Sequence, residues 1–350
     1  MKTADFDYQL PSHLIAQTPV EPRHASRLMV LRRRDGSISH GRFRELGEYL
    51  RSDDLLVCND SRVIPARLLG RKVPTGGKVE LLLTVKRADT LWEALTRGRR
   101  VPVGGLVEFS SVDGGNSETT LRAEILEPTP AGGRLVRFER AVEPLLERLG
   151  CVPLPPYIHR SLEDPERYQT VYADKDGSVA APTAGLHFTP KLMADLETRG
   201  IEFAFITLHI GPDTFRPVRA ERVEEHEMHT EYCHVTDQTA WAVSRAKVEE
   251  RRVVACGTTV VRALETAARD PSPGAPGTLR ADKGWTDLFI YPGYSFRVVD
   301  ALVTNFHLPR STLLMLVAAF TGEDLLSKAY QEAIKEEYRF YSFGDAMLIL

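Results

Sequence analysis

The sequence has few cysteines, no long apolar run and none of the common glycine-rich phosphate-binding motifs. Its four cysteines are Cys58, Cys151, Cys233 and Cys256. They are far apart and form no C-x-x-C pair, which argues against a disulfide framework and favours a reducing, cytoplasmic setting. The longest apolar run, 313–320, is far shorter than the ~18–20 residues that a bilayer span requires. Because residues 1–12 also lack an apolar block, we expect neither a membrane span nor a secretory signal.

Three catalytic or cofactor-binding signatures are absent as well. The chain contains no G-x-G-x-x-G after a strand and no G-x-x-x-x-G-K-[ST], so neither a dinucleotide fold nor a P-loop is supported. It also has no G-x-S-x-G nucleophile elbow, which removes the usual hydrolase signature.

The charge of the chain is unevenly distributed. The 350 residues are 43% hydrophobic and 27% charged, with a net charge of −3, as in an ordinary globular protein of about two domains. This slight acidity argues against a protein that coats nucleic acid non-specifically. Residues 62–100, however, hold ten Lys or Arg against three acidic residues. We therefore expect a local basic surface in this stretch.

The pattern of apolar residues predicts an α/β fold with an insertion. Between about 65 and 145, short β-type stretches follow one another with glycine-containing turns and no helix between them, which predicts a small antiparallel β-barrel. Strands and helices then alternate, which favours a sheet with parallel strands. We predict a discontinuous α/β domain formed by 1–64 and 146–350, with the barrel domain inserted at 65–145.

Individual elements of the α/β domain are predicted as follows. We expect a helix at 141–150 that closes the insertion, and strands near 287–291 and 297–306. The other predicted helices are 190–200, 238–251, 258–270, 311–320 and 323–340, and the other predicted strands are 201–211, 252–257 and 346–350.

Polar residues gather where several of these strands end. In 180–190, Thr183, Gly185 and His187 lie just before a predicted helix whose N-cap is Thr189. Gly257, Thr258 and Thr259 follow a second apolar strand, and His209, Asp213 and Thr214 follow a third. Each group is compatible with a plain structural turn. Because ligands of open α/β sheets bind at the carboxyl ends of strands, the groups together favour a shared pocket.

Further polar residues lie in comparable positions near the two ends of the chain. These are Asn59, Asp60 and Arg62, and, much later, Thr304, Asn305 and His307. Alone, either group is compatible with an Asx-turn or a helix cap.

The segment 225–234 concentrates histidine, glutamate and cysteine, including His226, His229 and Glu231. These are zinc-ligand residue types, but the spacing is not H-E-x-x-H. A polar wall of an active site and a hydrogen-bonded surface strand are the alternatives to a metal site.

Seven motifs, in this order, carry a resemblance to a known family. They are NDSRVIPARLLG, APTAGLHFT, LHIGPDTF, EHEMHTE, GTTVVRALE, TDLFIYPGY and TNFHLPRSTLLMLVAAF. The chain closely resembles the S-adenosylmethionine:tRNA ribosyltransferase-isomerase family of queuosine biosynthesis, from residue 6 to the C-terminus.

The resemblance implies a specific reaction. The substrate is a tRNA whose wobble position carries 7-aminomethyl-7-deazaguanine. Its amine receives the ribosyl part of S-adenosylmethionine, which rearranges to an epoxycyclopentanediol while adenine and methionine leave. S-adenosylmethionine is thus a co-substrate, and no bound cofactor or metal is expected. The resemblance also implies an α/β domain with an inserted barrel and a cytoplasmic location; we expect a monomer.

The chemistry suggests roles for the polar residues. We expect His187 or His229 to act as a base, oriented by Asp213 or Glu231, with His209 as a further catalytic candidate. The expected substrate-binding residues are Asn59, Asp60, Arg62, Thr183, Gly185, Thr214, His226, Glu231, Gly257, Thr258, Thr259, Tyr291, Thr304, Asn305 and His307. The expected tRNA-binding residues are Arg67, Arg71, Lys72, Arg97, Arg99 and Arg100. An S-adenosylmethionine-dependent RNA methyltransferase and a non-catalytic RNA-binding adaptor remain as alternatives.

Overall fold

The chain forms two compact units, one inserted in the other. The computed structural model describes residues 1–98, 101–111, 119–129, 132–268 and 279–350. Met1–Arg62 and Pro155–Leu350 form the first, which we call the α/β unit, and Val63–Leu154 form the second, the barrel unit. The barrel unit runs past the predicted limit of residue 145, because β11 (Gly150–Cys151) pairs with a strand of the barrel.

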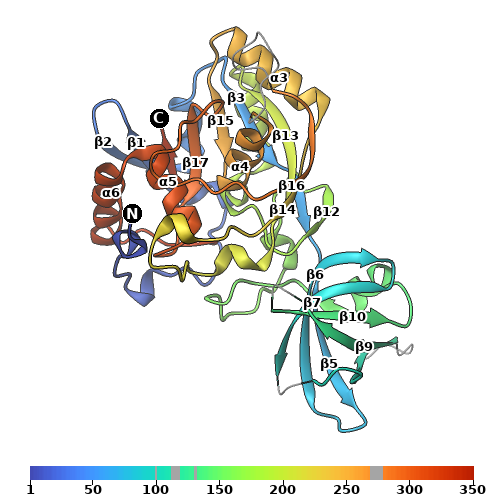
Figure 1. Ribbon diagram of the computed structural model, residues 1–350. Helices are drawn as coiled ribbons and strands as arrows, with labels where there is room; N and C mark the ends of the chain where they lie inside the picture. The colour runs from blue at the N-terminus through green and yellow to red at the C-terminus, as the bar shows by residue number, and fades with distance from the viewer. Residues whose placement is uncertain (99–100, 112–118, 130–131, 269–278) are drawn as a thin grey trace. The chain divides into compact units, whose positions relative to one another are not determined.

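A nine-stranded mixed sheet forms the centre of the α/β unit (Figure 1), in the order β16-β14-β13-β3-β15-β17-β18-β1-β2. Its strands are β1 (Arg27–Arg32), β2 (Ser37–Arg42), β3 (Leu55–Asn59), β13 (Glu202–His209), β14 (Glu231–Val235), β15 (Val253–Cys256), β16 (Asp282–Thr286), β17 (Ala301–Asn305) and β18 (Ala346–Ile349). The four middle strands β13, β3, β15 and β17 run parallel to their neighbours within this group. Their carboxyl ends therefore meet at one edge, as the alternation of strands and helices predicted.

Helices cover both faces of this sheet. Helices α3 (Asp237–Val248), α4 (Thr258–Ala267), α5 (Thr312–Thr321) and α6 (Glu323–Lys335) contribute to one apolar core, and α2 (Pro190–Thr198) contributes to the other. Strand β13 shows how the two faces alternate. Ile206 and Leu208 belong to the core with α3 and α4, whereas Phe203 and Phe205 pack against the core with α2, as the two-residue period of a strand requires.

The barrel unit is a closed ring of six antiparallel strands. They are β5 (Arg67–Val73), β6 (Lys78–Ala88), β7 (Leu91–Gly98), β8 (Leu106–Ser110), β9 (Thr120–Pro128) and β10 (Arg134–Phe138). The sheet order β5-β6-β7-β10-β9-β8 is closed by pairing of β5 with β8. The predicted fold class, an α/β domain with an inserted antiparallel barrel, is therefore confirmed.

Two local predictions were wrong. Residues 287–291 are not a strand: the edge strand β16 ends at Thr286, and Leu288 and Ile290 reach the core from irregular chain instead. The predicted helix at 141–150 is a 3-10 turn, Glu143–Leu145, followed by the single turn α1 (Leu146–Leu149). A small two-stranded sheet, β4 (Ser61–Val63) with β12 (Lys175–Ser178), completes the strands.

Candidate functional site

A pocket lies at the carboxyl ends of the parallel strands. It encloses about 560 Å³ of empty space, part of it open to solvent. Eight of the predicted substrate-binding residues line it: Thr183, Thr214, Gly257, Thr258, Thr259, Thr304, Asn305 and His307. Because these residues follow different strands, the pocket is the shared site that the strand ends predicted.

Helix α4 presents its first turn to the pocket. Strand β15 ends at Cys256, and Gly257 takes φ +99°, a left-handed conformation that favours glycine. The chain then enters α4 at Thr258, where the predicted helix 258–270 begins. Gly257, Thr258 and Thr259 all line the pocket, so the positive end of the helix dipole faces whatever binds there.

His187 lies behind the pocket wall. Its Nδ1 is 2.8 Å from the Ser26 hydroxyl, and its Nε2 accepts from the Asn305 amide at 3.2 Å. Asn305 in turn accepts from the Thr183 hydroxyl at 3.0 Å. Burial, reinforced by the positive charges of Arg339 and Arg23, lowers the pKa of His187 to about 3. The neutral imidazole thus positions Asn305, which is the residue that reaches the pocket.

Asn59 supports the pocket in a similar way. Its side chain donates to the Leu208 carbonyl at 3.0 Å and to the Thr259 hydroxyl at 3.3 Å, and accepts from the backbone N–H of Leu208 and Ser61. Asn59 therefore ties β3 to β13 and fixes Thr259.

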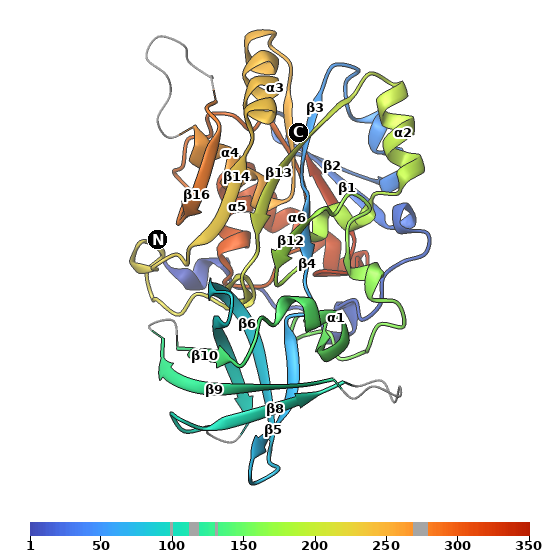
Figure 2. The same cartoon turned by 90° about the vertical axis from the view of Figure 1, so that its right-hand side faces the viewer.

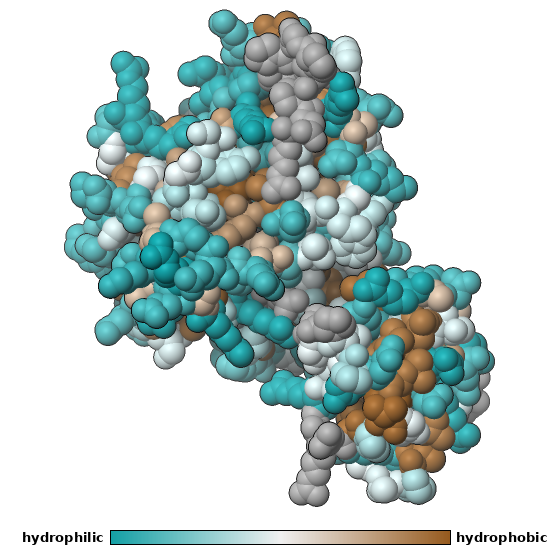
Figure 3. All heavy atoms as spheres, in the orientation of Figure 1, coloured by the Kyte–Doolittle hydropathy of each residue, from teal (hydrophilic) through white to brown (hydrophobic). Residues whose placement is uncertain are grey.

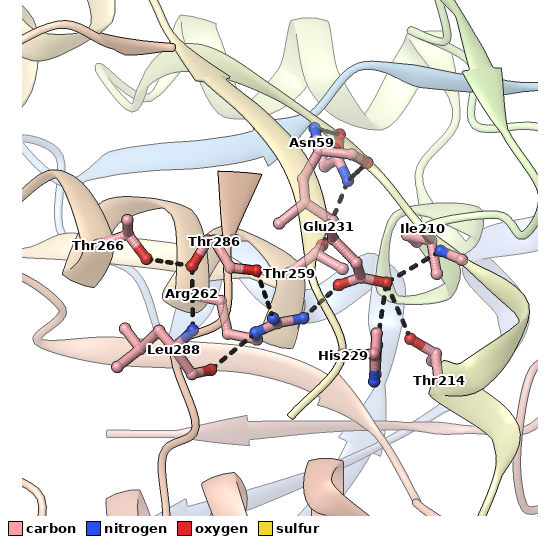
Figure 4. A network of polar contacts seen from close by, with 12 residues as sticks. Asn59, Ile210, Thr214, His229, Glu231, Thr259, Arg262, Thr266, Thr286 and Leu288 are labelled. Carbon is pink, nitrogen blue, oxygen red and sulfur yellow. Dashed lines mark hydrogen bonds and ion pairs between the residues drawn. The ribbon is translucent and has the colours of Figure 1, made fainter. Parts of the chain in front are cut away.

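A buried ion pair between Glu231 and Arg262 lies next to the pocket residue Thr214 (Figure 4). Glu231 is bonded to the Arg262 guanidinium and accepts from the Gly211 N–H at 3.0 Å and from the Thr214 hydroxyl at 3.1 Å. His229 Nε2 lies 3.5 Å from the same carboxylate. Burial alone would favour the neutral acid, but Arg262, His229 and the Gly211 N–H outweigh it and lower the pKa of Glu231 to about 2. Glu231 is thus an anion that orients both Thr214 and His229.

The other predicted residues lie outside the pocket lining. The Asp60 carboxylate accepts from Thr207, and burial raises its pKa. Arg62 pairs with Glu166 at the surface. The prediction that Gly185 admits a ligand finds no support, because a Cβ there would lie 2.1 Å from the Tyr172 hydroxyl.

The remaining histidines and Tyr291 lie among aromatic rings. His209 stacks on Tyr232. His226 and Tyr291 both pack against Phe289, with ring centroids 5.3 and 5.0 Å away. The side chain of Asp213 lies outside the described part of the structure.

Several residues of the site were missed at the sequence level. Arg262 is the most consequential, since it neutralises Glu231 and also donates to the carbonyls of Leu288 and Thr286. Tyr157, Tyr341 and Ser342 line the pocket. The one available signal was that Arg262 is a charged residue within the largely apolar helix 258–267.

Three of the predicted tRNA-binding cations share the outer face of the barrel. Arg67 pairs with Glu80 at 3.3 Å, whereas Arg71 and Arg97 are exposed. Exposed Lys78 lies opposite Arg71 in the strand register.

The other members of the predicted set are placed differently. Lys72 alternates to the opposite side of β5 from Arg71 and is half-buried. Arg99 and Arg100 lie outside the described residues. Exposed apolar side chains also lie on this unit, where Figure 3 shows brown areas; the most exposed are Leu69, Val73, Val103 and Leu106.

No metal centre is seen in the part of the chain that the structure describes. Among those residues no group of three or more His, Cys, Asp or Glu side chains is placed to hold a metal ion. None of their helices is long and apolar enough to cross a membrane. The four cysteines are free.

Two buried histidines predict that the folded protein loses stability in mild acid, at pH values well above those at which carboxylates take up protons. His307, like His187, has a pKa lowered by burial to about 3. In the unfolded chain both return to ~6.5, so the stability they provide is complete above pH 6.5 and is lost as the pH falls toward 3. At pH 5 we expect a loss of about 2 kcal/mol for each histidine. Urea unfolding between pH 7.5 and 5 measures it; a flat profile would contradict it, and His187→Asn should remove about half of the slope.

Taken together, the fold and the pocket define a discontinuous α/β protein with an inserted barrel and a strand-end site rich in threonine. The sequence profile of the queuosine biosynthesis protein family matches residues 3–349. The chain belongs to this family.

Curated relatives and a solved structure agree with this assignment. The chain is 54% identical, over 100% of both sequences, to the S-adenosylmethionine:tRNA ribosyltransferase-isomerases of Symbiobacterium thermophilum and Desulfitobacterium hafniense. The crystal structure of the S-adenosylmethionine tRNA ribosyltransferase of Thermotoga maritima is similar, with a TM-score of 0.56 and 41% identity over 99% of this chain and 100% of that one.

Proposed function

We propose that the chain transfers the ribosyl group of S-adenosylmethionine to the amine of 7-aminomethyl-7-deazaguanine at the wobble position of tRNA. The group is isomerised to an epoxycyclopentanediol, and adenine and methionine are released. The observation that carries the proposal is the convergence of seven polar side chains and Gly257 in one pocket, beside a His229–Glu231 pair, in a chain of the queuosine biosynthesis family.

At the level of class, the chain is an S-adenosylmethionine:tRNA ribosyltransferase-isomerase, a transferase of tRNA modification, since its full-length relatives at 54% identity carry this activity in their names. The finer proposal concerns the modified base and the residues that act on the substrates. It extends to a monomer that works in the cytoplasm without a bound cofactor or metal.

The pocket offers groups suited to each part of S-adenosylmethionine. The first turn of α4, with Thr258 and Thr259, suits the methionyl carboxylate, because backbone N–H groups and the helix dipole favour an anion. Asn305 and Thr304 can hydrogen-bond ribose hydroxyls and base edges. His307, neutral and held by the Thr304 hydroxyl at 2.7 Å, can do the same.

The reaction begins with loss of a proton from the carbon beside the sulfonium. A general base works best with a pKa near the working pH, and the burial that lowers the pKa of His187 to about 3 argues against this role for it. His229 has the arrangement expected of a base, since the Glu231 carboxylate lies 3.5 Å from its ring. Thr214, on the same carboxylate, lines the pocket. In this proposal His229 takes the proton and Glu231 stabilises the imidazolium that results.

The experiment that tests the function incubates the protein with S-adenosylmethionine and a tRNA carrying 7-aminomethyl-7-deazaguanine, without added metal. We expect free adenine and methionine, and a wobble nucleoside with increased mass. S-adenosylhomocysteine would instead indicate a methyltransferase. Binding of the RNA without any released product would indicate an adaptor.

The outer face of the barrel is proposed to hold tRNA phosphates. Replacing Arg71, Lys78 and Arg97 by glutamine is expected to weaken tRNA binding. The plot of the logarithm of the binding constant against the logarithm of the salt concentration should also become less steep, by about 2–3, since each lost phosphate contact removes ~0.7–0.9 from the slope. Binding of S-adenosylmethionine should not change. Filter binding at several salt concentrations measures the effect.

A matched control removes the same charge elsewhere on the same unit. Arg122, Arg137 and Arg140 lie on or next to β9 and β10, where Arg122 and Arg137 pair with Glu108 and Glu124. Their replacement by glutamine should leave the salt slope nearly unchanged. The proposal would be contradicted if the Arg71, Lys78 and Arg97 variant lost affinity for tRNA and S-adenosylmethionine equally. It would also be contradicted if the control variant weakened tRNA binding as much.

A further inference from the structure

Three aromatic rings form a row across one edge of the large sheet. His209 on β13 lies opposite Tyr232 on β14, which lies opposite Trp285 on β16. The rings of His209 and Tyr232 are nearly parallel, at 16° with centroids 5.7 Å apart. Trp285 is turned 76° from Tyr232, with its centroid 5.9 Å away. We call these three residues the aromatic row.

The row lies on the face of the sheet that α3 and α4 do not cover. Leu208 and Cys233, the chain neighbours of His209 and Tyr232, belong to the core with α4. Since side chains alternate along a strand, the row points to the other side. In Figure 2 strands β16, β14 and β13 face the viewer and α4 lies behind them. Trp285 remains 58% exposed at the outer end of this row.

Groups that suit a nucleic acid accompany the rings. The next rung of the same face pairs His234 with Lys283. Lys283 is exposed and has no ion-pair partner among the described residues, so its charge is available to a phosphate. His209 Nδ1 is sheltered from solvent and has no hydrogen-bond partner in the described part of the chain. His209 therefore belongs to the sheltered inner end of the row, and Trp285 and Lys283 are the members that an RNA can reach.

The row is continuous with the pocket. The chain that leaves His209 passes directly into Ile210 and then Thr214, both of which line the pocket. On the other side of the His209 ring the backbone approaches closely, because a Cβ at Gly177 would lie 2.9 Å from the imidazole. The ring is thus fixed between β12 and the pocket wall, while Trp285 marks the outer end of the row.

We infer that the aromatic row is a stacking surface for unpaired bases of the tRNA anticodon loop that flank the base in the pocket. This inference rests on the proposed function for the identity of the RNA. Proteins recognise single-stranded loops by stacking splayed bases on aromatic rings, and such stacking tolerates any base because every base has a π face. The exposed ring of Trp285 receives the outermost base, and Lys283 attracts the backbone beside it.

Replacement of Trp285 by alanine tests the stacking role. We expect the affinity for an anticodon stem-loop to fall by about 5- to 100-fold, and Trp285→Phe to retain most of it. In the enzyme assay the KM for tRNA should rise, while the KM for S-adenosylmethionine and kcat at saturating tRNA stay close to wild type. Because Trp285 is exposed, the thermal unfolding midpoint serves as a check that the variant is folded.

Trp241 provides the matched control. It is 61% exposed on α3 and packs against Arg245, away from the row on the helical face. Trp241→Ala should leave RNA binding within about twofold of wild type, well below a single stacking contact. A duplex of the stem without its loop should bind the wild type and Trp285→Ala equally.

The outcomes separate the row from the reaction. If the wild type releases adenine but Trp285→Ala binds the stem-loop as tightly as the wild type, the aromatic row is overturned and the function stands. Equal weakening of stem-loop and duplex binding also overturns it, because the residue then acts without unpaired bases. If the wild type releases no adenine, but Trp285→Ala weakens binding of the stem-loop and not of the duplex, the stacking role is supported and the proposed reaction is wrong.

Discussion

Replacing His229 by glutamine is expected to lower kcat by about 10²- to 10⁴-fold, the usual contribution of a general base. The side chain stays close in size and can still hydrogen-bond, so the KM for S-adenosylmethionine should change much less. The reason is local: Glu231, held as an anion by Arg262, lies 3.5 Å from the His229 ring and orients it. Steady-state release of adenine measures the effect.

His187→Gln is the comparison for this experiment. His187 bonds Asn305 and has a pKa of about 3, so its loss should act on substrate binding through Asn305 rather than on proton transfer. We expect a raised KM and a retained pH profile in this variant. In His229→Gln, by contrast, kcat should fall while the KM for S-adenosylmethionine changes much less. Turnover of His229→Gln within threefold of wild type would remove His229 from the catalytic role.

Replacing Arg262 by methionine is expected to destabilise the protein by about 3–5 kcal/mol, because it leaves the buried Glu231 carboxylate without a counter-charge. The side chains of this pair are 3% and 1% exposed, so water cannot replace the guanidinium. The variant also loses donors to the carbonyls of Leu288 and Thr286. Urea unfolding at pH 7 measures the loss.

The double variant Arg262→Met with Glu231→Met distinguishes a missing partner from a missing side chain. If the unpaired carboxylate is the main cause, the double variant recovers much of the stability lost in the single one. Its activity should stay low, since Thr214 loses its acceptor and His229 loses the carboxylate beside its ring. A single variant destabilised by less than ~1 kcal/mol, the scale of a surface ion pair, would contradict the expectation.

The sequence predicted the strand-end pocket because its signals were local. Gly257, Thr258 and Thr259 directly follow an apolar strand, and parallel strands bring such ends together. The barrel was predictable for the same reason, since alternating apolar residues and glycine turns are short-range features. Local patterns could not show which polar residue reaches the pocket. Asn305 and His187 are 118 positions apart in the chain. Nothing in the sequence therefore indicates that Asn305 lies between His187 and the pocket.

Arg262 was missed for a related physical reason. In a sequence, an arginine on a helix resembles the solvated residues that most surface helices carry. Its burial depends on Glu231, 31 positions earlier, and on the carbonyls of Thr286, at the end of β16, and Leu288, just after it. Tyr341 and Ser342 reach the pocket because the chain turns sharply at Tyr341, where φ is +71°. Tyrosine rarely adopts this left-handed conformation, so the residue type gave no reason to expect the turn at Tyr341.

The sheet order also constrains how the molecule is assembled as it is synthesised. The barrel unit uses one continuous segment, Val63–Leu154, and can collapse as soon as that segment has left the ribosome. Strand β3 emerges before it, yet its partners β13 and β15 come more than a hundred residues later. Strand β1 waits longer still for β18, near the other end of the chain. The sheet of the α/β unit therefore closes late in translation, when the whole segment of the barrel unit has already been synthesised.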